Sequence, residues 1–154
     1  MKIKYNLIIL FLLSLLFLSC SPVSKIGKLY TTAEADKLFG EVIFSVEMDR
    51  NQLDNMLNRT NKSIMFGLIN RQLIIHDNNR KLIYPVKADY KDSDVFTVYG
   101  VDMIRELLSD NRMEKQGNAE SENISVEQRQ EVLSISINEK TLETGVKCPP
   151  MCPN

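Results

Sequence analysis

The spacing of apolar residues along this chain predicts most of its secondary structure. Apolar residues occupy every second position in 42–48 and again in 133–137, the period that is typical of a strand. Between them, the apolar positions of 53–57 lie on one side of a predicted helix, which Asp49 can cap. A second helix with one apolar side follows Gly100 and carries Val101, Ile104, Leu107 and Leu108 on that side.

Shorter apolar runs predict the remaining elements. Residues 64–69 are almost all apolar, which indicates a central strand buried on both faces. Strands at 73–75 and 82–84 flank the sequence Asp-Asn-Asn-Arg, and because Asn tolerates positive φ we expect a tight hairpin turn there. Pro85 limits the second of these strands. Further elements are expected at 95–99, 124–126 and 141–146 as strands, and from Thr32 as a short helix.

These elements predict an α+β fold. About seven strands and two or three helices, with no internal repeat, favour one domain over 33–147 with a mostly antiparallel sheet and helices over one face. Its end is a predicted β-meander, which could instead form a small separate lobe. Residues 111–123 contain only Met113 and Ala119 as apolar residues, so this segment is predicted to be a mobile loop.

The first twenty residues carry an export signal. Lys2 and Lys4 precede an apolar run, 7–18, that ends at Ser19 and Cys20. The run has about a dozen residues, fewer than the ~20 that a membrane-spanning helix needs. This arrangement resembles the signal peptide of bacterial lipoproteins, with Phe-Leu-Ser-Cys at the position of their lipobox.

The resemblance implies a place for the protein in the cell. Residues 1–19 would be removed, and Cys20 would carry covalent lipid, the sole cofactor expected, that holds the chain on a membrane. Residues 20–32 would then be a tether, with Lys25 and Lys28 near lipid headgroups. Ser21, rather than the Asp that retains many lipoproteins at the inner membrane, favours the outer membrane of the cell envelope, facing the periplasm. Two alternatives stay open: a secretory signal that is cut elsewhere, and an uncleaved membrane anchor.

Charge and histidine content exclude several function classes. Without residues 1–19 the chain has 135 residues, 17 basic and 20 acidic, and a net charge of −3. This balance gives no reason to expect nucleic acid as a partner. His76 is the sole histidine, which excludes most metal-and-base enzymes because they need two or more imidazoles. We also find no phosphate-binding glycine loop, nucleophile elbow or zinc-protease helix in the sequence.

Two isolated groups of polar residues have a simple interpretation. His76 is expected to be a surface histidine beside Asp77; as a general base it would need a nucleophile that no motif supplies. Asp89, Asp92 and Asp94 lie in one polar segment. They lack the Gly and the terminal Glu of a calcium-binding EF-hand loop, so we expect a solvated loop.

The tail 148–154 contains the other two cysteines. In an oxidising compartment, Cys148 and Cys152 are expected to form a disulfide that closes a small loop at the end of the chain. Alternatively, the pattern Cys-Pro-x-x-Cys-Pro resembles the copper-binding segment of Sco-type copper chaperones. That resemblance implies Cu(I) binding by Cys148 and Cys152, with the thioether of Met151 nearby. Thiol-redox exchange and intermolecular disulfides are further alternatives.

The sequence therefore predicts a non-enzymatic, membrane-anchored envelope lipoprotein. Its expected partners are membrane lipid, through Cys20, and another envelope protein that it supports as an accessory subunit or assembly factor. One alternative is a copper-binding or thiol-redox protein that uses the cysteine tail. Another is a module that binds a small ligand or a cell-wall fragment.

Overall fold

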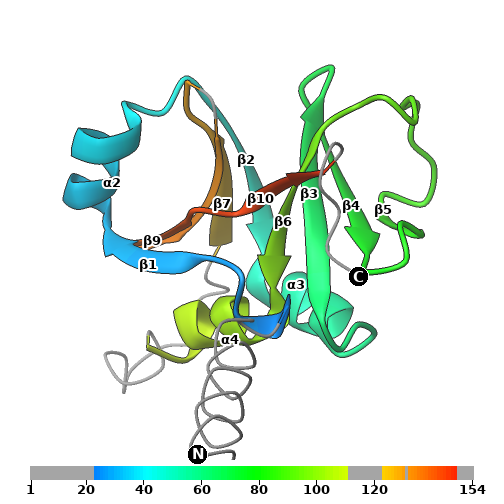
Figure 1. Ribbon diagram of the computed structural model, residues 1–154, viewed down its shortest axis with the longest axis horizontal. Helices are drawn as coiled ribbons and strands as arrows, with labels where there is room; N and C mark the ends of the chain where they lie inside the picture. Colours follow the sequence, from blue (N-terminus) through cyan, green and yellow to red (C-terminus); the bar gives the residue numbers. More distant parts are fainter. Residues whose placement is uncertain (1–22, 111–122, 131, 149–154) are drawn as a thin grey trace, which may run out of the picture.

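A computed structural model describes residues 23–110, 123–130 and 132–148. These residues form ten strands, three α-helices and one 3-10 turn (Figure 1). In chain order, the elements are η1 (Val23–Lys25), β1 (Lys28–Thr31), α2 (Thr32–Phe39), β2 (Phe44–Asp49), α3 (Arg50–Leu57), β3 (Ser63–Ile69), β4 (Gln72–Asp77), β5 (Leu82–Tyr84), β6 (Phe96–Gly100), α4 (Val101–Asp110), β7 (Asn123–Gln128), β8 (Leu133–Ile137), β9 (Lys140–Glu143) and β10 (Val146–Cys148).

The strands form two antiparallel sheets. Sheet A has the order β1-β9-β8-β7-β2, and sheet B has the order β10-β6-β3-β4-β5. The predicted α+β class with mostly antiparallel sheet is confirmed, and so is the meander, because β7, β8 and β9 are consecutive neighbours in sheet A. The strands divide between two sheets rather than forming one. The strands that the sequence did not predict are β1 and β10.

The same order of elements occurs twice along the chain. β2-α3-β3-β4 and β6-α4-β7-β8 are both strand–helix–strand–strand units, although the sequence contains no repeat. In each unit the helix carries the chain from one sheet to the other. β2 therefore pairs with β7 of the second unit, and β6 pairs with β3 of the first. The two units exchange their first strands.

The main core lies between the two sheets. Ile64, Phe66 and Ile75 of sheet B meet Val126 and Ile135 of sheet A there. Helices α3 and α4 close one end of this core, and α2 lies on the outer face of sheet A (Figure 1). The helices thus cover separate parts of the molecule, not one common sheet face as predicted.

The chain passes from sheet A to sheet B at Thr144 and Gly145. The sequence predicted one strand over 141–146. It divides there, with Thr144 at a φ of 61°, into β9 and β10. β10 then pairs with β6, so a single run of chain joins β9, inside sheet A, to β10, at the edge of sheet B.

The N-terminal segment is part of the fold from residue 23 onward. Residues 28–31, expected to belong to a tether, form β1 and pair with β9. The N–H of Gly100 donates a hydrogen bond to the carbonyl of Ile26 (2.8 Å). A side chain at position 100 could not be accommodated, because its Cβ would lie 2.1 Å from the Ser24 carbonyl oxygen. The predicted mobile loop lies outside the described residues except for Asn123, which begins β7.

The start of α3 agrees with the local sequence signal, whereas the hairpin turn after β4 differs from the predicted one. The carboxylate of Asp49 accepts a hydrogen bond from the N–H of Gln52 (3.0 Å) and caps α3 as predicted. In the turn after β4 the positive φ falls on Arg80, at 62°, rather than on an asparagine. In the part of the chain that the structure describes, no helix is both long and apolar enough to cross a bilayer.

Candidate functional site

Of the predicted cysteine sites, the structure describes Cys148. This residue ends β10, is buried, and is disulfide-bonded; its partner lies outside the described residues. Cys20, Met151 and Cys152 also lie outside them. The pairing of Cys148 with Cys152 and the lipid on Cys20 therefore stay predictions.

His76 is not the surface residue that the sequence predicted. Its side chain is 1% exposed and lies on the outer face of sheet B between the rings of Tyr90 and Phe96, with centroid distances of 4.8 and 4.5 Å. The chain between β5 and β6 folds back over β4 and brings Tyr90 onto the imidazole. Burial, and then the charge of Arg80, lower the His76 pKa, while Asp77 opposes them.

Neither ring nitrogen of His76 has a hydrogen-bond partner among the described residues. The neighbouring Asp77 uses its carboxylate locally, accepting hydrogen bonds from the N–H groups of Asn79 (2.8 Å) and Lys81 (2.9 Å). It therefore shapes the hairpin turn and does not orient the imidazole. An enclosed histidine is poorly placed to act as a general base, because its ring nitrogen must come within hydrogen-bond reach of the substrate.

His76 and Cys148 share the outer face of sheet B, but on different strands. Cys148 pairs in register with Phe96, whose ring contacts His76. Among the described residues, no three His, Cys, Asp or Glu side chains are grouped so that they could hold a metal ion. Asp94, from the acidic segment, closes a turn by accepting a hydrogen bond from the N–H of Lys91 (2.7 Å).

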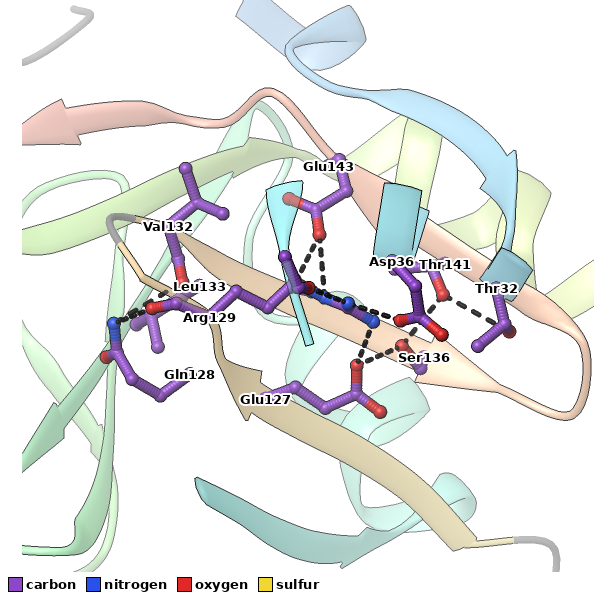
Figure 2. Close-up of polar contacts among 12 residues, drawn as sticks. Thr32, Asp36, Glu127, Gln128, Arg129, Val132, Leu133, Ser136, Thr141 and Glu143 are labelled. Carbon is purple, nitrogen blue, oxygen red and sulfur yellow. Dashed lines mark hydrogen bonds and ion pairs between the residues drawn. The ribbon is translucent and has the colours of Figure 1, made fainter. Parts of the chain in front are cut away.

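A buried polar cluster on the outer face of sheet A was not predicted (Figure 2). At its centre is Arg129, directly after β7, whose side chain is fully buried. Its Nη1 donates to Asp36 Oδ1 of α2 and to the Gly40 carbonyl, both at 2.5 Å. Its Nη2 lies 3.1 Å from Glu127 Oε2, and its Nε lies 3.3 Å from Glu143 Oε1. The guanidinium thus joins sheet A to the end of α2.

Hydroxyl groups complete the cluster. Ser134 accepts a hydrogen bond from Arg129 Nε (3.1 Å) and donates one to Glu143, while Ser136 donates one to Glu127 (2.8 Å). Thr141 lies within hydrogen-bond distance of Ser136 (3.0 Å). Figure 2 shows Asp36, Glu127 and Glu143 around the guanidinium, with Ser136 and Thr141 linked to it through Glu127.

The electrostatics of the cluster follow from burial and from its excess of carboxylates. Burial raises the pKa of Glu143; the hydrogen bond from Ser134 and the charge of Arg129 oppose this. For Arg129 the largest single influence, burial, disfavours the charge. The hydrogen bond to Asp36 and the charges of the three carboxylates outweigh it and raise the Arg129 pKa. The Arg129 guanidinium is enclosed and therefore has a structural role, while Asp36, at 46% side-chain exposure, reaches the surface.

Four of the five large apolar residues that are exposed in the described chain lie toward one end of the molecule; the fifth, Val86, lies beside α3. Leu38, Val42 and Ile43 precede β2, and Val95 precedes β6; their exposed fractions range from 40% to 67%. Since β2 and β6 both run from this end toward α3 and α4, these residues lie at the end opposite those helices (Figure 1). We call Leu38, Val42, Ile43 and Val95 the apolar end.

A cleft of about 510 Å³ opens between the two sheets beside the apolar end. Val95, Thr97, Val132 and Lys147 are among the residues that line it. A second hollow, lined by Leu38 and Gly40, shares Val132 with this cleft. The surface around the apolar end is therefore continuous from α2 to the start of β6.

The buried cluster supports this surface from below. Arg129 holds the carbonyl of Gly40 and the carboxylate of Asp36, which flank Leu38 in the chain. The polar cluster is thus bonded to the chain on both sides of Leu38, one residue of the apolar end. No protein-family model matches this chain, and comparison with curated proteins and with solved structures gives no match.

Proposed function

We propose that this protein is a non-enzymatic, lipid-anchored protein of the bacterial cell envelope that binds another envelope protein through the apolar end. The observation that carries the proposal is that Leu38, Ile43 and Val95, at 61%, 67% and 52% exposure, lie at the end of the molecule opposite α3 and α4. Clustered exposed apolar side chains mark interaction sites more often than scattered ones do. Binding would remove these side chains from water, which is the main favourable term in protein association.

The shape of this surface also favours a protein partner. It comes from three separate segments, the end of α2, the chain before β2 and the chain before β6, and the Arg129 cluster fixes the first of them. A preorganised surface loses little conformational freedom on binding. The cleft beside it is lined by apolar residues and by Thr97, Gln128, Gln130 and Lys147, so apolar and polar groups alternate next to the apolar end.

The test compares matched valine substitutions. Val95 belongs to the apolar end, whereas Val86, 95% exposed, lies beside α3. We expect Val95→Asp together with Ile43→Asp to abolish recovery of the partner after crosslinking in cells and affinity purification, because an interface anchor contributes about 2 kcal/mol or more. Val86→Asp should recover the same partner as the unmodified protein. Equal recovery by all variants would contradict the proposal.

The lipid anchor is tested separately. Cys20→Ser removes the thiol that the proposed lipid needs, so the protein should move from the membrane fraction to the soluble fraction. Mass spectrometry of the purified protein should show a modified Cys20 at the N-terminus. Unchanged fractionation, or an unmodified N-terminus elsewhere, would rule out the anchor.

Ligand binding in the cleft is a second candidate. Its volume of about 510 Å³ lies within the range of small-molecule sites, and Lys147 supplies a positive charge on its wall. A small anion with an apolar part would fit this lining. Thermal-shift measurements on the unmodified protein and on Lys147→Gln test this candidate; a hit that stabilises both equally would place the ligand elsewhere.

The copper or thiol-redox alternative depends on free thiols. Cys148 is disulfide-bonded, so either activity requires reduction first. Alkylation with and without reductant, followed by titration of the reduced protein with Cu(I), tests this alternative. A disulfide that persists in cells and no Cu(I) uptake after reduction would exclude it.

A further inference from the structure

The start of the described chain is fixed against the end that α3 and α4 close. η1 packs on α4 and on β6, and the Ser24 carbonyl lies so close to Gly100 that a Cβ there would be 2.1 Å away. In the sequence, Ser21 and Pro22 separate Cys20 from η1. Three Cα–Cα steps span at most about 11 Å. A lipid on Cys20 would therefore hold this end of the domain close to the membrane.

The surface of this end is basic. Exposed cationic side chains come from η1, from the end of α3 and the turn after it, from the turn after β4, and from α4: Lys25, Arg59, Lys62, Lys81 and Arg105. The exposed acids on α4 are Asp102 and Glu106. The exposed cations of this end thus outnumber the exposed acids of α4, although the chain from Cys20 onward has a net charge of −3. We call Lys25, Arg59, Lys62, Lys81 and Arg105 the basic end.

An apolar side chain stands beside these cations. Val86 is 95% exposed and lines a shallow groove with Arg59 of the basic end and Met56 of α3. Exposed apolar residues next to lysine and arginine are typical of surfaces that rest in the headgroup region of a bilayer.

We propose that the basic end lies against the membrane surface and contacts anionic phospholipid headgroups. This inference rests on the proposed lipid anchor and deepens the proposed function. The apolar end lies at the far side of the domain. The six residues of β2 alone separate the two ends by about 20 Å at roughly 3.3 Å per residue. The apolar end would then face the aqueous side. The partner would contact it through a region that protrudes from the membrane, rather than through a segment within the membrane.

The test measures orientation on vesicles. The full lipidated protein is reconstituted into phosphatidylcholine vesicles, with or without phosphatidylglycerol, that carry a headgroup-attached quencher. One fluorophore is placed at Asn55→Cys on α3 and, in a second sample, at Glu41→Cys near the apolar end; both positions are exposed. We expect strong quenching at position 55, little at position 41, and a larger difference when phosphatidylglycerol is present.

Matched charge reversals isolate the electrostatic contribution to the orientation of the domain on vesicles. Each basic residue at an anionic surface raises association roughly fivefold, so loss of three positive charges should weaken membrane association by on the order of 100-fold, and reversal of the three charges should weaken it further. Lys25→Glu, Lys62→Glu and Lys81→Glu together should abolish the effect of phosphatidylglycerol. The control combines Lys37→Glu, Lys91→Glu and Lys147→Glu, exposed lysines outside the basic end, and should retain that effect.

The outcomes separate the two proposals. Equal quenching at positions 55 and 41 on vesicles that hold the protein, or equal loss in both lysine triples, would overturn the inference while leaving the anchor in place. If the unmodified protein binds vesicles no better than Cys20→Ser, the anchor itself fails and the inference falls with it.

Discussion

The outer faces of the two sheets are both covered by other segments, but the residues buried there differ in polarity. Beneath α2, sheet A buries Arg129, Glu143 and a set of hydroxyl groups. Beneath the chain between β5 and β6, sheet B buries Met65, Ile74, Phe96 and Val98, with His76 as the polar exception. Each sheet therefore has a second buried layer beside the shared core, one polar and one almost wholly apolar.

The difference matters for how each layer responds to change. A buried ionic layer is stable only while every charged group keeps its partner, because an unpaired buried charge is costly. An apolar layer depends on volume and shape, and its losses are smaller and more gradual. We therefore expect sheet A to be the more sensitive to loss of one side chain, and sheet B to respond mainly to steric fit and to the protonation of its histidine.

The largest expected effect is loss of the guanidinium in sheet A. Arg129→Met leaves Glu143 buried without its cation, and we expect unfolding free energy to fall by about 3–5 kcal/mol. Urea unfolding followed by circular dichroism measures this. The matched control adds Glu143→Leu to Arg129→Met, which removes the unpaired charge and should recover part of the loss. A change below about 1 kcal/mol for Arg129→Met would mean that the cluster does not behave as a buried ionic layer.

A smaller effect is expected from crowding the apolar layer of sheet B. The ring of Phe96 lies over Gly67, and a Cβ at position 67 would be 2.7 Å from its Cε1. Gly67→Ala should therefore destabilise the protein by about 1–3 kcal/mol in the same urea measurement. Adding Phe96→Leu should relieve the overlap. If the double variant is no more stable than Gly67→Ala alone, the ring contact is not the cause.

The smallest expected effect is the pH response of His76. Its pKa is lowered in the folded state, so the unfolded chain binds the proton more tightly and stability rises with pH in that range. As pH falls below the unfolded value of about 6.5, we expect stability to fall by at most ~1.4 kcal/mol per pH unit. Glu143 acts in the opposite direction at lower pH, because its folded-state pKa is raised. His76→Leu should flatten thermal unfolding temperatures between neutral pH and mild acid; an unchanged slope would assign the response to other groups.

Secondary structure was largely predictable because its signals are local. The alternation in 42–48 and 133–137, the apolar run of β3 and the Asp49 cap each depend on residues close in sequence, and the structure confirms the corresponding elements. The division into two sheets was not predictable in this way. It depends on α3 and α4 each crossing from one sheet to the other, which no local pattern encodes.

The buried polar cluster was missed for a related reason. The serines in β8 alternate with apolar residues, which is the ordinary pattern of a strand with one solvated face. Ser134 is buried because α2 covers that face, and Arg129 follows its strand at a position where an arginine is usually exposed. His76 was misplaced in the same way, since Tyr90, 14 positions further on by residue number, encloses it. Neither the sequence of β8 nor that of β4 indicates that a distant segment covers its outer face.

The exchange of first strands between the two strand–helix–strand–strand units affects when the chain can acquire its structure. β2 pairs with β7, and β1 pairs with β9. Neither of these two strands of sheet A therefore has its pairing partner until the last third of the chain is present. In a chain that emerges N-terminus first, β3, β4, β5 and β6 of sheet B can pair early, whereas sheet A cannot close until β7 to β9 have emerged. The topology therefore delays completion of sheet A.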